Sequence, residues 1–209
     1  LENMTVRAKI EGKGLDLLSP PSGVIRINHL KSGESSPITF SFSPKSRANT
    51  RVILVIQYFD SVGRKCTDWL GEIETNFLGC YVKPLQLSES EHESERLNFK
   101  DNTSHTSFNV EGLQLSKITK IAKEMPGLHL CNLKEEDTRS IIYHSGESCL
   151  EGSKFLSMIF LRKLGEEQSL RVALELICHS NDIDKSSELK EEMSLYLKNK
   201  LLEFNAKFV

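Results

Sequence analysis

The pattern of apolar residues changes near residue 88, and this change limits the available folds more than any other feature of the sequence. Before it, short runs bounded by Gly or Pro alternate apolar and polar residues, which is typical of strands in an antiparallel sandwich. Residues 88–96 are Ser-Glu-Ser-Glu-His-Glu-Ser-Glu-Arg and contain almost nothing that could be buried. After them, helical spacing appears and the chain closes on a long amphipathic segment. The sequence therefore predicts two modules in fixed order, joined by a polar spacer.

The composition excludes several classes of protein. A chain of 209 residues holds one large domain or two small ones, and 38% hydrophobic residues can form cores. The 27 basic and 29 acidic side chains give a net charge of −2, whereas nucleic-acid-binding domains are usually strongly basic. No apolar run approaches the roughly 18 residues that cross a bilayer. We therefore expect a soluble protein that does not bind nucleic acid.

The cysteines and the first residue bear on localisation. Five cysteines, widely spaced and without a CxxC pair, do not resemble the even and dense set of a small secreted scaffold. The chain begins at Leu1 and has no pattern of a secretory leader. We expect a piece of a longer protein in a reducing, cytoplasmic compartment.

In the first module, residues 51–59 form the strongest predicted strand. This run is apolar on both faces, which predicts a central position in a sheet. A turn containing Gly at residues 60–64 leads into a returning strand at 67–73, and residues 78–82 would add a last strand. These runs predict an immunoglobulin-like antiparallel β-sandwich over residues 1–87, followed by a polar Ser/Glu linker over residues 88–104.

The second module, residues 105–209, mixes strands with helices. A strand is predicted at 106–110, and apolar residues at helical spacing predict a helix that stops at Pro126-Gly127. Further strands are predicted at 128–133, 139–144, 154–164 and 170–179, before a C-terminal helix with an apolar stripe. The overall class is therefore α+β, with a small antiparallel-sheet platform that carries helices on one face.

No catalytic centre is predicted. Gly146-Glu147-Ser148-Cys149 begins like a nucleophile elbow but lacks its second Gly. His144 with Cys149 or Ser148 would supply the parts of a hydrolase, but no orienting group stands at a recognisable spacing. An uncharacterised hydrolase is a remote alternative, and we expect a protein that is not an enzyme.

Metal and cofactor sites are not predicted either. His129 with Cys131, and Cys178 with His179, are isolated pairs without the paired close spacings of structural zinc sites. Neither phosphate-binding glycine motif, GxGxxG or GxxxxGK[ST], occurs.

Four residues are weak candidates for contact with a partner protein. Trp69, the only tryptophan, is either a core residue of the sandwich or a surface anchor. In a regular strand it shares a face with Gly71 and Ile73, which favours the core. The basic residues on the two long strands would offer a positive groove to acidic peptides, or simply a solvated face. The candidates are Trp69, Lys154, Arg162 and Arg171.

Several short segments of the second module resemble the sequences of a known family. They are residues 107–116, which open onto a helix, residues 139–146 and 170–176, and Leu189 to Met193 in the last helix. Over residues 105–205 this order is similar to the platform of the appendage, or ear, of adaptor-complex and coatomer large chains, and most similar to the delta-type adaptor chain. Residues 30–42 resemble the sandwich of such appendages in outline. Tails of subunits of the Bardet–Biedl complex share the two-module layout.

The resemblance implies a function without catalysis. An appendage is a tail that docks accessory proteins through short peptide motifs, or docks onto sister subunits, in intracellular membrane trafficking. It would associate with membranes only indirectly, through the larger complex. The alternative is a structural dimerisation tail of a subunit in another large assembly, ciliary or nuclear.

Overall fold

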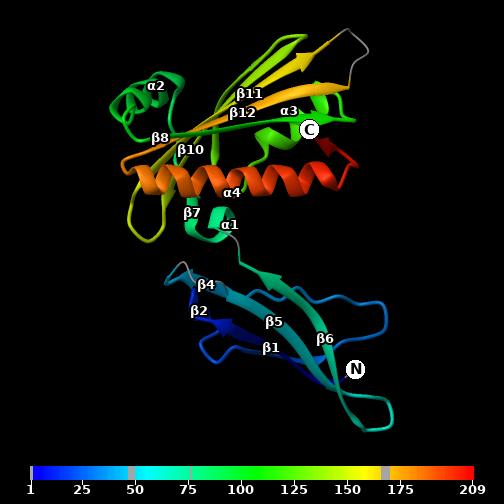
Figure 1. Ribbon diagram of the computed structural model, residues 1–209. Helices are drawn as coiled ribbons and strands as arrows, with labels where there is room; N and C mark the ends of the chain where they lie inside the picture. Colours follow the sequence, from blue (N-terminus) through cyan, green and yellow to red (C-terminus); the bar gives the residue numbers. More distant parts are fainter. Residues whose placement is uncertain (1, 47–49, 76, 166–169) are drawn as a thin grey trace. The chain divides into compact units, whose positions relative to one another are not determined.

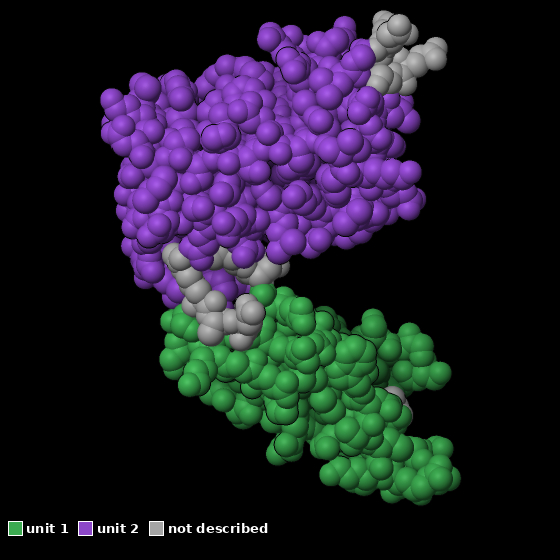
Figure 2. All heavy atoms as spheres, in the orientation of Figure 1, with its two compact units in different colours: residues 1–76 green, residues 77–209 purple. Residues whose placement is uncertain are grey.

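The chain forms an α+β protein with two compact units, Leu1–Asn76 and Phe77–Val209, as seen in a computed structural model (Figures 1 and 2). The structure describes residues 2–46, 50–75, 77–165 and 170–209. All strand pairs in these ranges are antiparallel. The predicted fold class is confirmed.

Unit 1 is a small sandwich of two antiparallel sheets. The larger sheet has the order β3-β1-β5-β6, and β2 pairs with β4. The strands are β1 (Glu2–Gly12), β2 (Leu15–Ser19), β3 (Val24–His29), β4 (Ser41–Pro44), β5 (Thr50–Phe59) and β6 (Lys65–Glu74). Alternate residues of β1 and β5, namely Met4, Val6 and Val52, are buried on the inner face. As predicted from its apolar run, β5 is a central strand.

Unit 2 is built on a larger antiparallel sheet. Its order is β13-β8-β12-β11-β10-β7, and β9 also pairs with β10. The strands are β7 (Val82–Pro84), β8 (Thr103–Glu111), β9 (His129–Glu135), β10 (Arg139–Ser148), β11 (Lys154–Leu164), β12 (Arg171–Ser180) and β13 (Lys207–Phe208). The helices are α1 (Phe77–Tyr81), α2 (Glu89–Asn98), α3 (Leu115–Lys123) and α4 (Ile183–Leu202).

The core of unit 2 lies between this sheet and α4. One stripe of α4, with residues four apart, is fully buried: Leu189, Met193, Leu197 and Leu201. Full burial of one such side chain contributes about 1.5–3 kcal/mol to folding. The predicted apolar stripe of the last helix is confirmed. In the described part of the chain, no helix has the length and apolar character needed to span a membrane.

The boundary between the units lies at residue 76, not at residue 87. The segment predicted as the last strand of the sandwich instead forms α1 and leads into β7, which pairs with β10 of unit 2. Leu78, Tyr81 and Val82 are buried in the core of unit 2. A five-residue apolar run does not by itself distinguish a strand from a helical turn, so tertiary packing decided its structure.

The predicted linker, residues 88–104, is not a linker. It contains α2 and the start of β8. Ser88 caps α2, since its side chain accepts a hydrogen bond from the backbone N–H of Glu91, and the Glu91 side chain bonds back to the Ser88 backbone. While α3 and α4 cover one face of the sheet, as predicted for the helices of this module, α2 lies on the opposite face (Figure 1).

Candidate functional site

The face of the unit 2 sheet that is opposite α4 is only partly covered. At one end it supports α2, and toward the other end none of the described helices covers it (Figure 1). Strand register places three rows of side chains there. The rows are His105, Ile177, Met158 and Tyr143; Ser107, Glu175, Phe160 and Ile141; and Asn109, Ala173, Arg162 and Arg139. We call these three rows the open face.

The centre of the open face is hollowed and carries two apolar side chains, Phe160 and Ile141, among polar ones. A depression of about 740 Å³ lies over β8, β10, β11 and β12, with Ile141, Phe160 and Arg162 among its lining residues. Phe160 and Ile141 are partly exposed, although they stand directly opposite each other on neighbouring strands. Apolar side chains left in water beside polar ones are typical of a surface that binds another protein.

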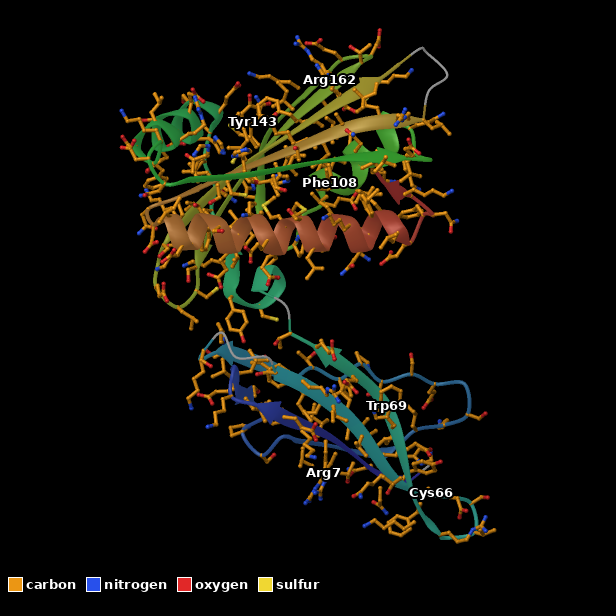
Figure 3. The ribbon with its side chains drawn as sticks, viewed as in Figure 1. Arg7, Cys66, Trp69, Phe108, Tyr143 and Arg162 are labelled. Atoms are coloured by element: carbon orange, nitrogen blue, oxygen red, sulfur yellow. The ribbon has the colours of Figure 1, made fainter. Side chains whose placement is uncertain are left out.

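Two arginines border this depression. Arg139 and Arg162 are directly opposite in the β10–β11 pair. Glu136 holds the Arg139 guanidinium in two hydrogen bonds, each 2.7 Å long, which raise the pKa of Arg139. Arg162 has no such carboxylate partner among the residues that the structure describes. Figure 3 shows it near the end of β11 that is remote from α2. Arg162 and, on β12, Glu175 are therefore charged groups of the open face without an ion pair among the described residues, beside the partly exposed Phe160 and Ile141.

The chain itself places an acidic helix against the other end of this face. His92 of α2 is buried, with its Nε2 3.1 Å from the His144 carbonyl oxygen. Its ring meets the ring of Tyr143 edge to face, with the centroids 5.4 Å apart. Tyr143 is labelled beside α2 in Figure 3.

Ion pairs anchor both ends of α2. Glu89 pairs with Lys134 at 2.5 Å, and a hydrogen bond from Lys134 lowers the pKa of Glu89. Glu95 pairs with Lys154. This face of the sheet thus holds an acidic helix through one buried ring and two lysine–carboxylate pairs.

Buried histidines lie close to where α2 docks. The Nδ1 of His179 is 2.8 Å from the Thr103 hydroxyl, and the Nε2 of His144 is 3.4 Å from the Lys123 carbonyl oxygen. The other ring nitrogen of each has no hydrogen-bond partner among the described residues. Burial lowers the pKa of both His144 and His179 to about 4, and it also lowers the pKa of His92. All three rings are neutral at pH 7.

The structure separates the four predicted contact residues. Trp69 is in unit 1, whereas the three basic residues are in unit 2. Arg162 belongs to the open face. Lys154 points to the same side of β11 but is engaged by Glu95, and Arg171 is engaged by Glu111 at 2.6 Å. Sequence reasoning therefore identified Arg162, a cation of the open face that has no ion pair within the described ranges.

The prediction that Trp69 is a core residue is wrong, because its side chain is 65% exposed. Leu54 pairs with Gly71 but the next residue, Val55, pairs with Trp69, so Leu70 is an extra residue in β6. This β-bulge turns Trp69 to the face opposite that of Gly71 and Ile73. Strict alternation from sequence could not reveal the bulge.

Sequence reasoning missed α2 and the residues beneath it. The signal that could have found the helix is the capping box Ser-x-x-Glu at Ser88 and Glu91. Nothing in the local sequence marks Tyr143 or Phe160 as residues of the open face, because both lie in predicted strands whose facing layers depend on the tertiary fold.

The residues that the remote hydrolase alternative would need are not brought together. His144 and Ser148 are four residues apart on the same strand, which corresponds to roughly 13 Å. The Ser148 hydroxyl accepts hydrogen bonds from the backbone N–H groups of Leu150 and Glu151. Cys149 is exposed. No hydrogen bond joins His144 to either nucleophile candidate among the described residues.

The two His/Cys pairs have separate environments. Cys178 contacts Met193 on the α4 side of the sheet, and His179 faces the other way toward Thr103. Cys131 contacts the Ser145 hydroxyl. Within the described ranges, no group of three or more His, Cys, Asp or Glu residues could hold a metal ion.

Comparison of the chain with protein-family models, curated proteins and solved structures gives no match. Arguments about function therefore rest on the geometry of the open face and on the sequence pattern.

Replacing His92 with Ala should loosen α2. The change removes the buried ring contact with Tyr143 and the hydrogen bond to the His144 carbonyl, so we expect a loss of about 1–3 kcal/mol in the free energy of unfolding. Hydrogen exchange should accelerate across residues 89–98 while α4 stays protected. Leu97→Ala is the matched control, because Leu97 is on the same helix but 56% exposed. Equal effects of the two changes would show that His92 does not anchor the helix.

Proposed function

We propose that this chain is a non-catalytic protein-interaction module whose open face binds acidic segments of partner proteins. The observation that carries the proposal is α2, an acidic helix of the chain that is held on the same face of the same sheet. The rest of the open face offers another cation, Arg162, beside Phe160 and Ile141.

Such a face suits a short peptide with carboxylates and a large apolar side chain. A carboxylate would pair with the planar Arg162 guanidinium in two parallel hydrogen bonds. An aromatic or aliphatic side chain would fill the depression over Phe160 and Ile141, where a few anchors supply most of the binding energy. Arg139 would add charge but remain held by Glu136.

In the setting that the sequence resemblance implies, the chain would be the appendage-like tail of a larger subunit. It would dock accessory proteins or sister subunits in intracellular membrane trafficking, in the cytoplasm, and would reach membranes only through its complex. The two-unit layout, a small sandwich followed by a platform sheet, is compatible with this role.

The test uses 12–15-residue peptides selected from a random library by binding to the chain. We expect the selected peptides to be rich in Asp or Glu around an aromatic residue. Arg162→Glu should weaken their binding at least tenfold by fluorescence anisotropy, because it replaces an attraction with a repulsion at the open face. Added salt should also weaken binding to the unmodified chain.

Lys120→Glu is the control for that experiment. It makes the same charge change at an exposed residue of α3, on the other side of the sheet. Peptides that bind both variants as tightly as the unmodified chain would contradict the proposal. A selection that yields basic or purely apolar peptides would contradict it as well.

A further inference from the structure

Strand β6 is an edge strand with an unusual number of exposed apolar residues. It has β5 on one side, and in the described part of unit 1 no strand pairs with its other side. Trp69 is 65% exposed, Leu70 49% and Ile73 56%. An edge of this kind offers free backbone hydrogen-bonding groups together with apolar side chains, which is the surface used for strand addition.

The bulge at Leu70 restricts which strand can be added. Before it, Lys65, Thr67 and Trp69 share one face of the sheet, and after it Glu72 and Glu74 share that same face. The alternation therefore changes phase in the middle of β6. A regular strand paired along the whole of β6 would match its side chains to β6 side chains on the same face only up to Leu70. Beyond Leu70, each of its side chains would lie opposite a β6 side chain on the other face of the sheet. The bulge thus protects the edge against most strands.

Pairing with a second copy of β6 avoids this mismatch of faces. We propose that β6 pairs antiparallel with β6 of a second copy of this chain, with the two bulges opposite each other, so that the two four-stranded sheets become one. The alternation of side chains then shifts at the same point in both copies. Paired residues of the two copies therefore lie on the same face of the joined sheet along the whole strand. The interface would be isologous, as two-fold symmetry requires.

This alignment also gives a self-complementary order of side chains. Numbering both copies alike, it places Lys65 opposite Glu74, Thr67 opposite Glu72, Cys66 opposite Ile73, and Asp68 opposite Gly71. Lys65 has no ion pair among the described residues of its own chain. Glu74 lies 3.5 Å from Arg51, but its side chain is 76% exposed and can also reach a second cation. The space beside Gly71 is open, so Asp68 meets no side chain there.

Two of the alternative alignments fail on charge. Centring the pair on Leu70 would set Asp68 against Glu72, and centring it on Gly71 would set Asp68 against Glu74. Like charges directly opposite in a ladder are destabilising. Each of the two exposed Lys65–Glu74 pairs contributes little binding energy. Their role is to favour this alignment over others. Burial of Trp69, Leu70 and Ile73 supplies the affinity.

The alignment is tested with one added cysteine. In Ile73→Cys, the introduced thiol lies opposite the native Cys66 of the second copy. Mild oxidation should give a covalent dimer whose peptide map links Cys66 to the cysteine introduced at position 73. Within one chain the two positions are roughly 20 Å apart, too far for a disulfide. Glu72→Cys is the control, because Thr67 faces it and no such link should form. Equal cross-linking of the two variants would overturn the alignment.

Association is measured by analytical ultracentrifugation of the full chain. The unmodified chain should dimerise, and Trp69→Glu should abolish dimerisation without unfolding unit 1, because Trp69 is exposed. Lys65→Glu and Glu74→Lys should each weaken the dimer severalfold, and the double variant should restore it. A monomer at every concentration would overturn the proposal and assign the edge to a different chain. A dimer that tolerates Trp69→Glu would overturn it too.

Discussion

Replacing Gly127 with Ala should destabilise unit 2 by about 2–5 kcal/mol, the sum of a left-handed backbone penalty and an overpacking penalty. Gly127 has φ +71°, and a Cβ there would overlap the Leu78 carbonyl oxygen and lie 2.7 Å from the Val82 carbonyl oxygen. Both oxygens belong to the backbone of the segment that crosses into unit 2, so neither can rotate away. Chemical denaturation measures the loss.

Gly152→Ala is the control that separates the two penalties. Gly152 has nearly the same backbone conformation, φ +67°, but the nearest atom to its Cβ would be 3.6 Å away, at the end of the Glu147 side chain. We expect a loss of about 1–2 kcal/mol, the backbone penalty alone. Similar losses for the two variants would show that close packing of residues 77–84 over Gly127 does not matter for stability.

Acidification should destabilise unit 2 by about 3–4 kcal/mol between pH 7 and pH 5 through His144 and His179 alone. Burial lowers the pKa of both to about 4 in the folded state, against about 6.5 in the unfolded chain. In this window the unfolded state binds more protons than the folded state, so stability rises with pH and falls on acidification. His92, whose pKa is also lowered by burial, adds to the same trend.

Urea denaturation at pH 7, 6 and 5 measures this slope. Carboxylates whose pKa is lowered by basic partners, such as Glu89 and Glu136, lose their contribution only below about pH 4.5 and do not enter the window. His179→Gln should flatten the slope, because it removes one of the two buried rings. A pH-independent stability of the unmodified chain would contradict the prediction, and an NMR titration of the ring protons would give the same answer residue by residue.

Much of unit 2 could be predicted from sequence because its strands and helices are long. The strand predicted at 154–164 matches β11, and the apolar stripe of α4 follows directly from residues spaced for one face of a helix. The short segments could not be predicted. Residues 78–82 are equally compatible with a strand and a helical turn, and the pairing of β7 with β10 decided where they belong.

The candidate site was less accessible to sequence reasoning than the fold. Arg162 could be named as a candidate because it is a basic residue in an otherwise apolar strand. Lys154 and Arg171, which form ion pairs with carboxylates, fit the same pattern. Only the paired carboxylates, Glu95 on α2 and Glu111 on β8, distinguish the free cation from the engaged ones. These pairings join residues that are 59 and 60 positions apart in the chain.

The sequence by itself determined the α+β class, the order of a sandwich before a platform, and most strands and helices, because periodicity is a local property of the chain. The tertiary structure decided the boundary at residue 76, the docking of an almost wholly polar helix through His92, and the outward turn of Trp69. Each of these depends on contacts between distant residues: a strand pair, a buried ring and a bulge. The apparent spacer at residue 88 is accordingly part of the platform.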